Sequence, residues 1–215
     1  SAPIAVGGDH SITHPMVRAL QARLDRPITV VCFDHHLDHQ YWARSLDPVF
    51  HTNVMTHVSD VVGAGRLIQI GAEPVQTAPA ELAEWFAARL SRAGRQIALL
   101  SPELSDNAAV LDAVGCGGDV YVSVDVDVLP RHQMRATAYP AEIGVTLERV
   151  VELIRHIADH NRIVGADLVE FAADRADRDP EVLADAARAS ILLYELLSAA
   201  AQTSARERVS GEAHA

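Results

Sequence analysis

Acidic residues and histidines gather in three short segments of the chain. The segments are GGDHS at residues 7–11, DHHLD at residues 34–38 and SVDVD at residues 123–127. Each segment follows or ends an apolar run rich in β-branched residues, which predicts a buried strand. Because the carboxyl ends of parallel strands meet at one edge of a sheet, we expect the three segments to converge on one site.

Alternation along an extended chain decides which side chains of the second segment share a face. Residues two apart point the same way, so we expect Asp34, His36 and Asp38 to converge, while His35 and Leu37 face away. The same rule pairs the two aspartates of the third segment. The histidine of the first segment follows a Gly-Gly turn, where the backbone can bend sharply near a site.

These side chains are suited to divalent metal ions. Carboxylates buried at strand ends are costly unless a cation offsets their charge. A set of carboxylates and imidazoles favours Mn(II) or a similar ion over metals that prefer thiolates. Two such ions about 3.5–4 Å apart can share a water and lower its pKa. The candidate metal ligands are His10, Asp34, His36, Asp38, Asp125 and Asp127.

Each segment taken alone is weak evidence for a metal site. A single Asp-x-Asp pair or a single histidine near a strand end is more often a cap or a solvated loop residue, and Gly-Gly-Asp-His alone indicates only a turn. The three segments together, in the order of an α/β protein, favour the metal site.

Strands and helices are expected to alternate along the chain. Apolar runs predict strands at residues 4–6, 28–33, 67–70, 97–100, 120–126 and 163–169. Helices are predicted at about 11–23, 53–62, 79–93, 108–114 behind a Ser105 cap, after Thr146, and from Pro180 to about 200. This order predicts one α/β domain with three layers and a mostly parallel sheet, its N-terminal elements short or missing. We assign residues 1–201 to this domain and residues 202–215 to a polar, frayed tail.

Composition argues against several classes of partner. The 215-residue chain carries a net charge of −11 and no block of Lys and Arg, so we expect neither nucleic acid nor an anionic membrane surface as a partner. No apolar run approaches the length of a transmembrane helix and no signal peptide is visible, so a cytoplasmic location is expected. Cys32 lies in an apolar strand and Cys116 in a glycine-rich loop, which predicts no disulfide framework.

The three segments, in this order, resemble the signatures of the ureohydrolase family, which includes arginase and agmatinase. Those signatures are Gly-Gly-Asp-His-Ser, Asp-Ala-His-x-Asp and Ser-x-Asp-x-Asp. The first and third are matched, and the second has His35 in place of alanine. The stretch GADLVEF at residues 165–171 also resembles the last strand of the family, whose glutamate faces a guanidinium group. The resemblance covers residues 4–200.

The resemblance implies an arginase-like fold and a site with two Mn(II) ions per chain. One ion would be held by His10, Asp34, Asp38 and Asp125, and the other by Asp34, His36, Asp125 and Asp127. Activated water would attack a guanidinium carbon and release urea and an amine. Glu170 would pair with the cationic guanidinium through charge-assisted hydrogen bonds, as a catalytic and substrate-binding residue. Asp9 would support the ligands without touching the metal.

The departures from the family pattern fall on recognition of the substrate's far end. Residues 128–131 read VLPR where the family continues with Asp-Pro, and the loop at 71–76 lacks the Arg-Asp of arginases. Local alignment places the catalytic-loop histidine of arginases at Met55, while His51 in the same loop is our candidate proton shuttle. Asn53 matches a substrate-binding asparagine. We therefore expect a guanidino substrate other than free arginine: a modified or peptide-borne arginine, or a guanidino metabolite.

Two other readings compete with this one. The string Asp34-His35-His36 also resembles the DHH phosphoesterases, but in that family an Asp-x-Asp precedes the Asp-His-His, whereas here it follows. The chain could also be a catalytically degenerate metal-binding scaffold or a partner subunit, because its front end and loops are altered. Homo-oligomers are usual in the ureohydrolase family, and the apolar final helix could serve a subunit contact or the core.

Overall fold

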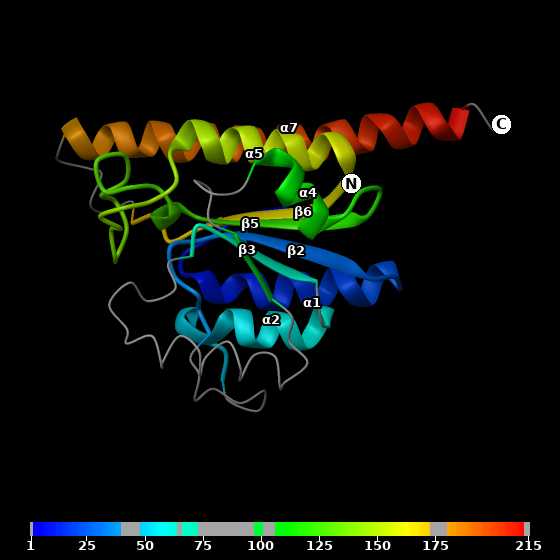
Figure 1. Cartoon of the computed structure of the whole chain (residues 1–215), viewed down its shortest axis with the longest axis horizontal. Helices are drawn as coiled ribbons and strands as arrows, with labels where there is room; N and C mark the ends of the chain where they lie inside the picture. The colour runs from blue at the N-terminus through cyan, green and yellow to red at the C-terminus, as the bar shows by residue number, and fades with distance from the viewer. Residues whose placement is uncertain are drawn as a thin grey trace.

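A single parallel sheet organises the computed structural model of the chain (Figure 1). The structure describes residues 2–39, 48–63, 66–72, 97–100, 106–172 and 180–212. Within them, six strands pair in the order β1-β6-β5-β2-β3-β4, and every pairing is parallel. The strands are β1 (Ile4–Val6), β2 (Ile28–Phe33), β3 (Leu67–Ile70), β4 (Ile97–Leu100), β5 (Asp119–Asp125) and β6 (Arg162–Val169).

Helices cover both faces of the sheet, which confirms the three-layer α/β fold. Figure 1 shows α1 and α2 on one face and α4, α5 and α7 on the other. The two faces carry separate apolar clusters, because side chains of each strand alternate between them. The helices are α1 (Thr13–Leu24), α2 (Val54–Val62), α4 (Asn107–Val114), α5 (Leu147–His160) and α7 (Pro180–Glu212). Short 3₁₀ helices are η1 (His10–Ile12), η2 (His51–Asn53) and η3 (Val126–Val128).

The strand predictions agree with the structure to within one residue at each end. Strand β2 is buried along its whole length, as its unbroken apolar run predicts for a strand covered on both faces. Thr146 caps α5, its hydroxyl accepting a hydrogen bond from Arg149 N at 3.3 Å, as predicted. The cap of α4 is Asp106 rather than Ser105, because the Asp106 carboxylate accepts from Ala109 N at 2.9 Å.

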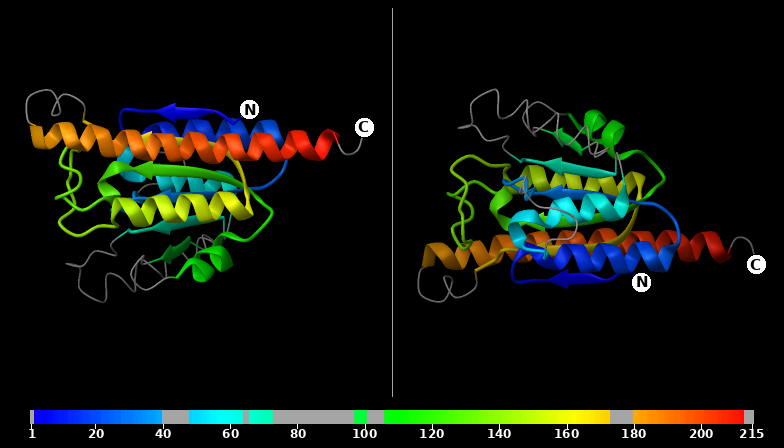
Figure 2. Two further views of the ribbon diagram at one scale, coloured as in Figure 1. Left: turned by 90° about the horizontal axis from the view of Figure 1, so that it is seen from above. Right: turned by 90° about the horizontal axis from the view of Figure 1, so that it is seen from below.

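The last helix is longer than the sequence predicted. Figure 2 shows α7 lying beside α5 on one face of the sheet. It continues to Glu212, so the expected end near residue 200 and the frayed residues after Gln202 are wrong. Thr203 explains part of the extension, because it is buried and its hydroxyl accepts a hydrogen bond from Ile163 N at 2.8 Å. The helix therefore runs through the boundary that we expected between residues 201 and 202.

Two predicted segments lie wholly or largely where the structure gives no description. The helix expected at residues 79–93 and most of the loop at 71–76 lie outside the described residues. In the part of the chain that the structure describes, none of the helices combines the length and apolarity that crossing a membrane would require.

The order of the strands brings the chemistry-bearing segments together. Strands β1, β6, β5 and β2 are consecutive neighbours in the sheet, and all run in the same direction. The segments at residues 7–11, 34–38 and 126–128 follow β1, β2 and β5, and Glu170 follows β6. All four carboxyl ends therefore lie along one edge of the sheet, where α/β proteins bind their ligands.

Candidate metal centre

Backbone hydrogen bonds join the first segment to the end of β6. Gly7 N donates to Leu168 O at 2.9 Å, and Glu170 N donates to Gly8 O at 2.8 Å. A Cβ atom at Gly7 would lie 2.2 Å from the Cδ1 atom of Ile12, so the absence of a side chain permits this close packing. The turn leads directly into η1, whose first residue is His10.

His10 lies at the centre of a buried cluster of carboxylates. Its side chain is fully buried. Three carboxylate oxygens surround its Nδ1 atom, at 3.2 Å for Asp34, 3.1 Å for Asp38 and 3.3 Å for Asp125. Among the described residues, Nδ1 has no partner in regular hydrogen-bond geometry. A nitrogen facing three carboxylates in this way is the arrangement expected around a cation.

His36 forms the second half of the site with Asp34, which also faces His10, and with Asp127. Its Nδ1 atom lies 2.9 Å from Asp127 Oδ2 and 3.8 Å from Asp34 Oδ1. The His36 side chain is 43% exposed, whereas both carboxylates are buried. This half of the site therefore opens to solvent, while the half around His10 is closed.

Asp34 connects the two halves of the site. Its Oδ2 atom faces His10, while its Oδ1 atom faces His36 and accepts a hydrogen bond from His36 N at 2.6 Å. Asp125 and Asp127 are linked in a similar way, because Asp125 Oδ1 accepts from Asp127 N at 2.9 Å. The structure thus brings together all of the side chains that the sequence predicted as ligands.

The backbone that positions these side chains differs from the extended chain that we expected. The chain bends at His35 and His36, and Asp38 adopts a left-handed conformation with φ of 45°. Asp127 lies in η3 rather than on a continued strand. The candidate ligands nevertheless converge from this bent backbone.

Burial and crowding disfavour the charged carboxylates in the absence of a cation. Burial, followed by repulsion from Asp38 and Asp125, raises the pKa of Asp34 well above its usual value. Burial and the nearby Asp127 raise the pKa of Asp125 to about 8. A divalent cation would reverse both effects, because it stabilises the ionised form. The oxygen and imidazole donors present therefore fit divalent metal ions.

Glu170 lies beside His10 at the end of β6. Its Oε1 atom accepts a hydrogen bond from His10 N at 2.9 Å, so the carboxylate is at the rim of the cluster. Its backbone is in the left-handed region, with φ of 64°, which is uncommon for a residue other than glycine. Backbone strain of this kind is frequent at functional sites.

The loop that carries His51 and Asn53 packs against the first segment through η1 and η2. Hydrogen bonds from Ser11 are the main cause of a lowered pKa at Asp9, and the nearby His51 contributes. Asn53 is buried, with Oδ1 accepting from Phe50 N at 2.8 Å and Nδ2 donating to a backbone carbonyl at 3.1 Å. Its substrate-binding role stays a prediction, since both ends of its amide serve its own loop.

The surroundings of Met55 and Asp9 indicate structural roles for both residues. Met55, the position aligned with the loop histidine of arginases, is fully buried in the apolar cluster between α2 and the sheet. Asp9 caps η1 by accepting from Ser11 N at 3.0 Å. Asp9 therefore stabilises the turn that positions His10. We expected Asp9 to support the ligands, and this cap would do so through the backbone.

Sequence reasoning missed a buried carboxylate beneath His10. Asp167 lies within β6, is fully buried, and accepts hydrogen bonds from three hydroxyl groups. A signal was available: Tyr121 and Ser123 are two apart in an apolar strand, and their hydroxyls share a face. The other half of that signal was Asp167 itself, a charged residue within the apolar run that precedes Glu170.

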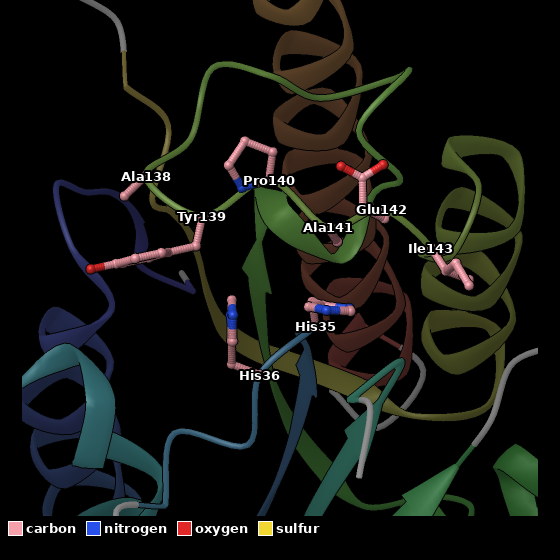
Figure 3. A pocket seen from close by; sticks show the side chains of 8 residues that line it. All are labelled: His35, His36, Ala138, Tyr139, Pro140, Ala141, Glu142 and Ile143. Carbon is pink, nitrogen blue, oxygen red and sulfur yellow. The ribbon is translucent and has the colours of Figure 1, made fainter. Parts of the chain in front are cut away.

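A cavity of about 490 Å³ opens beside the exposed half of the site (Figure 3). It is lined by His35, His36 and residues 138–143. The rings of His36 and Tyr139 meet edge-on, with centroids 6.2 Å apart. Because His36 belongs to both the cavity and the carboxylate cluster, the cavity borders the candidate metal centre.

Known proteins are similar to this chain in sequence and in fold. The model of the arginase family matches residues 1–196. An arginase of Glycine max is 29% identical over 184 residues, covering 82% of this chain and 48% of that protein. An N(1)-aminopropylagmatine ureohydrolase of Thermus thermophilus is 28% identical over 173 residues, covering 79% of this chain and 54% of that protein.

The fold comparison agrees with the sequence comparison. The structure of proclavaminate amidino hydrolase from Streptomyces clavuligerus matches with a TM-score of 0.71 at 25% identity, covering 94% of this chain and 65% of that chain. The present chain spans about half the length of the curated relatives that it matches. Since the family model covers most of its residues, the chain belongs to the arginase family.

Proposed function

We propose that the chain is a binuclear manganese hydrolase that cleaves a guanidino group and releases urea and an amine. The observation that carries this proposal is the division of the site into two halves joined by Asp34. His10 faces one set of carboxylates and His36 another, so the donors suit two ions rather than one. Membership of the arginase family supports the reaction class.

The proposed ligands follow the two halves. His10, Asp34, Asp38 and Asp125 would hold one Mn(II), and Asp34, His36, Asp125 and Asp127 the other. When bound, the ions supply Lewis-acid activation of water at neutral pH. The chain contributes a buried floor to the site, because Asp34 directly after β2 and Asp125 at the end of β5 are both buried.

Glu170 and His51 are the proposed catalytic residues outside the metal ligands. The carboxylate of Glu170, fixed at the rim by the His10 backbone, would bind the guanidinium and orient its carbon toward the ions. His51 lies half-buried near the first segment and would transfer a proton to the leaving amine. Asn53 would hold the loop in place and is a further candidate for substrate contact.

The cavity beside His36 is our proposed place for the far end of the substrate. It offers aromatic and aliphatic surface from Tyr139, Pro140 and Ile143, with the Glu142 carboxylate at its side (Figure 3). We propose a small-molecule or peptide guanidino substrate other than free arginine. Two relatives named for aminopropylagmatine and proclavaminate support a substrate of this wider class.

The test is release of urea from a panel of guanidines by the Mn(II)-loaded protein. The panel includes arginine, agmatine, 4-guanidinobutyrate and a short peptide containing arginine. We expect urea from at least one of the last three at a higher kcat/KM than from arginine. Asp125→Asn should abolish release, while Asp112→Asn, an exposed carboxylate on α4, should leave it unchanged.

Two results would contradict the proposal. Manganese binding without urea from any guanidine would favour the alternative, a catalytically degenerate scaffold or partner subunit. Full activity in Asp125→Asn with intact folding, measured by circular dichroism, would show that the carboxylate cluster is not the reaction site.

A further inference from the structure

A buried hydrogen-bond network lies behind His10, on the side away from the carboxylate cluster. Asp167 on β6 is fully buried and accepts from Tyr121 OH at 2.6 Å, from Ser123 Oγ at 2.6 Å and from Thr13 Oγ1 at 2.8 Å. Ser123 Oγ also lies 3.0 Å from His10 Nε2. The network therefore links a buried carboxylate to a candidate metal ligand through one serine.

Counting hydrogens fixes the direction of each bond. Ser123 has a single hydroxyl hydrogen, and at 2.6 Å the carboxylate of Asp167 is its strongest acceptor. The hydroxyl hydrogen of Thr13 also goes to Asp167, so it does not serve Ser123, 3.3 Å away. Ser123 Oγ is left as an acceptor. His10 Nε2 must therefore carry a hydrogen and donate it to Ser123.

This direction determines what His10 presents to the site. With Nε2 bound to Ser123, the neutral ring directs the lone pair of Nδ1 at carboxylate oxygens 3.1–3.3 Å away. A lone pair facing carboxylates is repulsive unless a metal ion or a proton lies between them. The network thus selects the tautomer that can bind a metal and fixes the plane of the ring.

We propose that Asp167 is a positioning residue that acts through Ser123 to prepare His10 for the ion in the closed half of the site. The inference rests on the metal centre of the proposed function. Among the described residues, His36 has no comparable buried partner behind its ring, and its side chain is 43% exposed. Two ions bound there would therefore be held unequally, and the ion at His10 would depend on the network.

Cys32 is the other group near His10 Nε2, with Sγ at 3.9 Å. It also lies 4.0 Å from Asp34 Oδ2, to which its thiol can donate. A thiol sulfur is a weak acceptor, so it does not replace the serine oxygen. Cys32→Ala therefore serves as a control that alters the packing behind His10 without cutting the link to Asp167.

The experiment is a Mn(II) titration of the full chain, with bound and free metal counted by electron paramagnetic resonance. Ser123→Ala should weaken one of the two binding steps by about 10- to 100-fold and leave the other nearly unchanged. Asp167→Asn, which keeps the shape but offers a weaker acceptor, should weaken the same step less. Tyr121→Phe removes a donor to Asp167 without touching the His10–Ser123 link, so both steps should stay as in the wild type.

A second measurement covers the case in which a variant does not fold. In the metal-free wild type, the Nε2 hydrogen of His10 should give a slowly exchanging proton resonance in ¹⁵N-labelled protein. A proton on Nδ1 alone in the neutral ring would overturn the inference, as would unchanged stepwise affinities in Ser123→Ala. A wild-type chain that binds no Mn(II) would overturn the proposed function as well. Two-step binding without urea release would overturn only the proposed function.

Discussion

Glu170 shows how one residue can serve both structure and binding. Its carboxylate accepts a hydrogen bond from the backbone of His10, and its own backbone is strained at the end of β6. A glutamine would keep the acceptor oxygen for that bond and the length of the side chain. It would lose only the negative charge, so the charge can be tested separately from the geometry.

We predict that Glu170→Gln lowers kcat/KM for the guanidino substrate by about 10- to 100-fold. The reason is the loss of a charge-assisted hydrogen bond, worth about 1.5–3 kcal/mol. Steady-state urea release measures the effect, and the Mn(II) titration should not change. Glu148→Gln, an exposed acid in the first turn of α5, is the matched control. A weakened metal affinity with kcat/KM restored at saturating metal would contradict a substrate-binding role.

We predict that His51→Ala lowers kcat by at least about 100-fold with little change in KM, because a proton donor is removed. Added imidazole should restore part of the lost rate, which a purely structural residue would not permit. His160→Ala, at the exposed end of α5, is the control. An unchanged kcat in His51→Ala would assign the proton transfer to another group.

The metal-ligand candidates could be predicted from the sequence because each follows an apolar strand. The surroundings of Asn53 could not, because its amide is bound by the backbone atoms of Phe50 and Pro48, whose positions depend on the loop. Asp167 was missed for a related reason. A carboxylate inside an apolar strand has meaning only when hydroxyls from a neighbouring strand and from α1 are seen beside it.

At the scale of elements, the segment between η3 and α5 forms the cavity wall. Arg131 N donates to Ala141 O at 2.6 Å, and Val145 N donates to Val128 O at 2.8 Å, which folds the segment back on itself. Gly144 lies where the end of this segment packs against its beginning: a Cβ atom at Gly144 would be 2.4 Å from Val128 O. A backbone atom cannot yield as the end of a flexible side chain can.

We predict that Gly144→Ala lowers the free energy of unfolding by about 1–3 kcal/mol, because overpacking forces the backbone to shift. Urea denaturation measures the loss. Gly118→Ala is the control, since its Cβ would meet Asn161 Oδ1 at an ordinary 3.7 Å. Equal stability of the two variants would show that the segment moves freely. A raised KM in Gly144→Ala with unchanged metal affinity would support the cavity as the place of the substrate's far end.

The boundaries of the elements could be predicted where the sequence pattern is local. Unbroken apolar runs and a Thr146 cap gave β2 and the start of α5. The end of α7 could not be predicted, because the residues beyond 200 are polar and what holds Thr203 is a backbone group of β6. Long-range contacts of this kind leave no periodic signal in the sequence.

At the scale of the whole molecule, the sheet gathers negative charge at one edge. A chain with a net charge of −11 places four carboxylates around two histidines on a largely buried floor. The alternation of strands and helices predicted this edge, because every parallel crossover returns the chain to the same side. The stability of the fold therefore depends on the protons or cations that offset the charge of these four carboxylates.

We predict that metal-free protein loses stability as the pH rises from about 4 to 8. The raised pKa of Asp125, about 8 against an ordinary 3.8, and that of Asp34 mean that the folded state holds more protons than the unfolded chain in this range. Three carboxylates outweigh burial to raise the pKa of His10, which has the same sign. Stability from these groups is complete below the unfolded pKa values and disappears as the pH passes the folded ones.

Mn(II) should reverse this trend, because it binds the deprotonated side chains and releases their protons. Thermal unfolding between pH 5 and pH 8, with chelator or with excess Mn(II), should show a gap in Tm that widens as the pH rises. Asp125→Asn should flatten the metal-free decline, which separates the cluster from the general effect of a growing negative charge. A metal-free Tm that rises with pH would mean that the cluster is already neutralised within the fold, and the argument for a cation at this edge would fail.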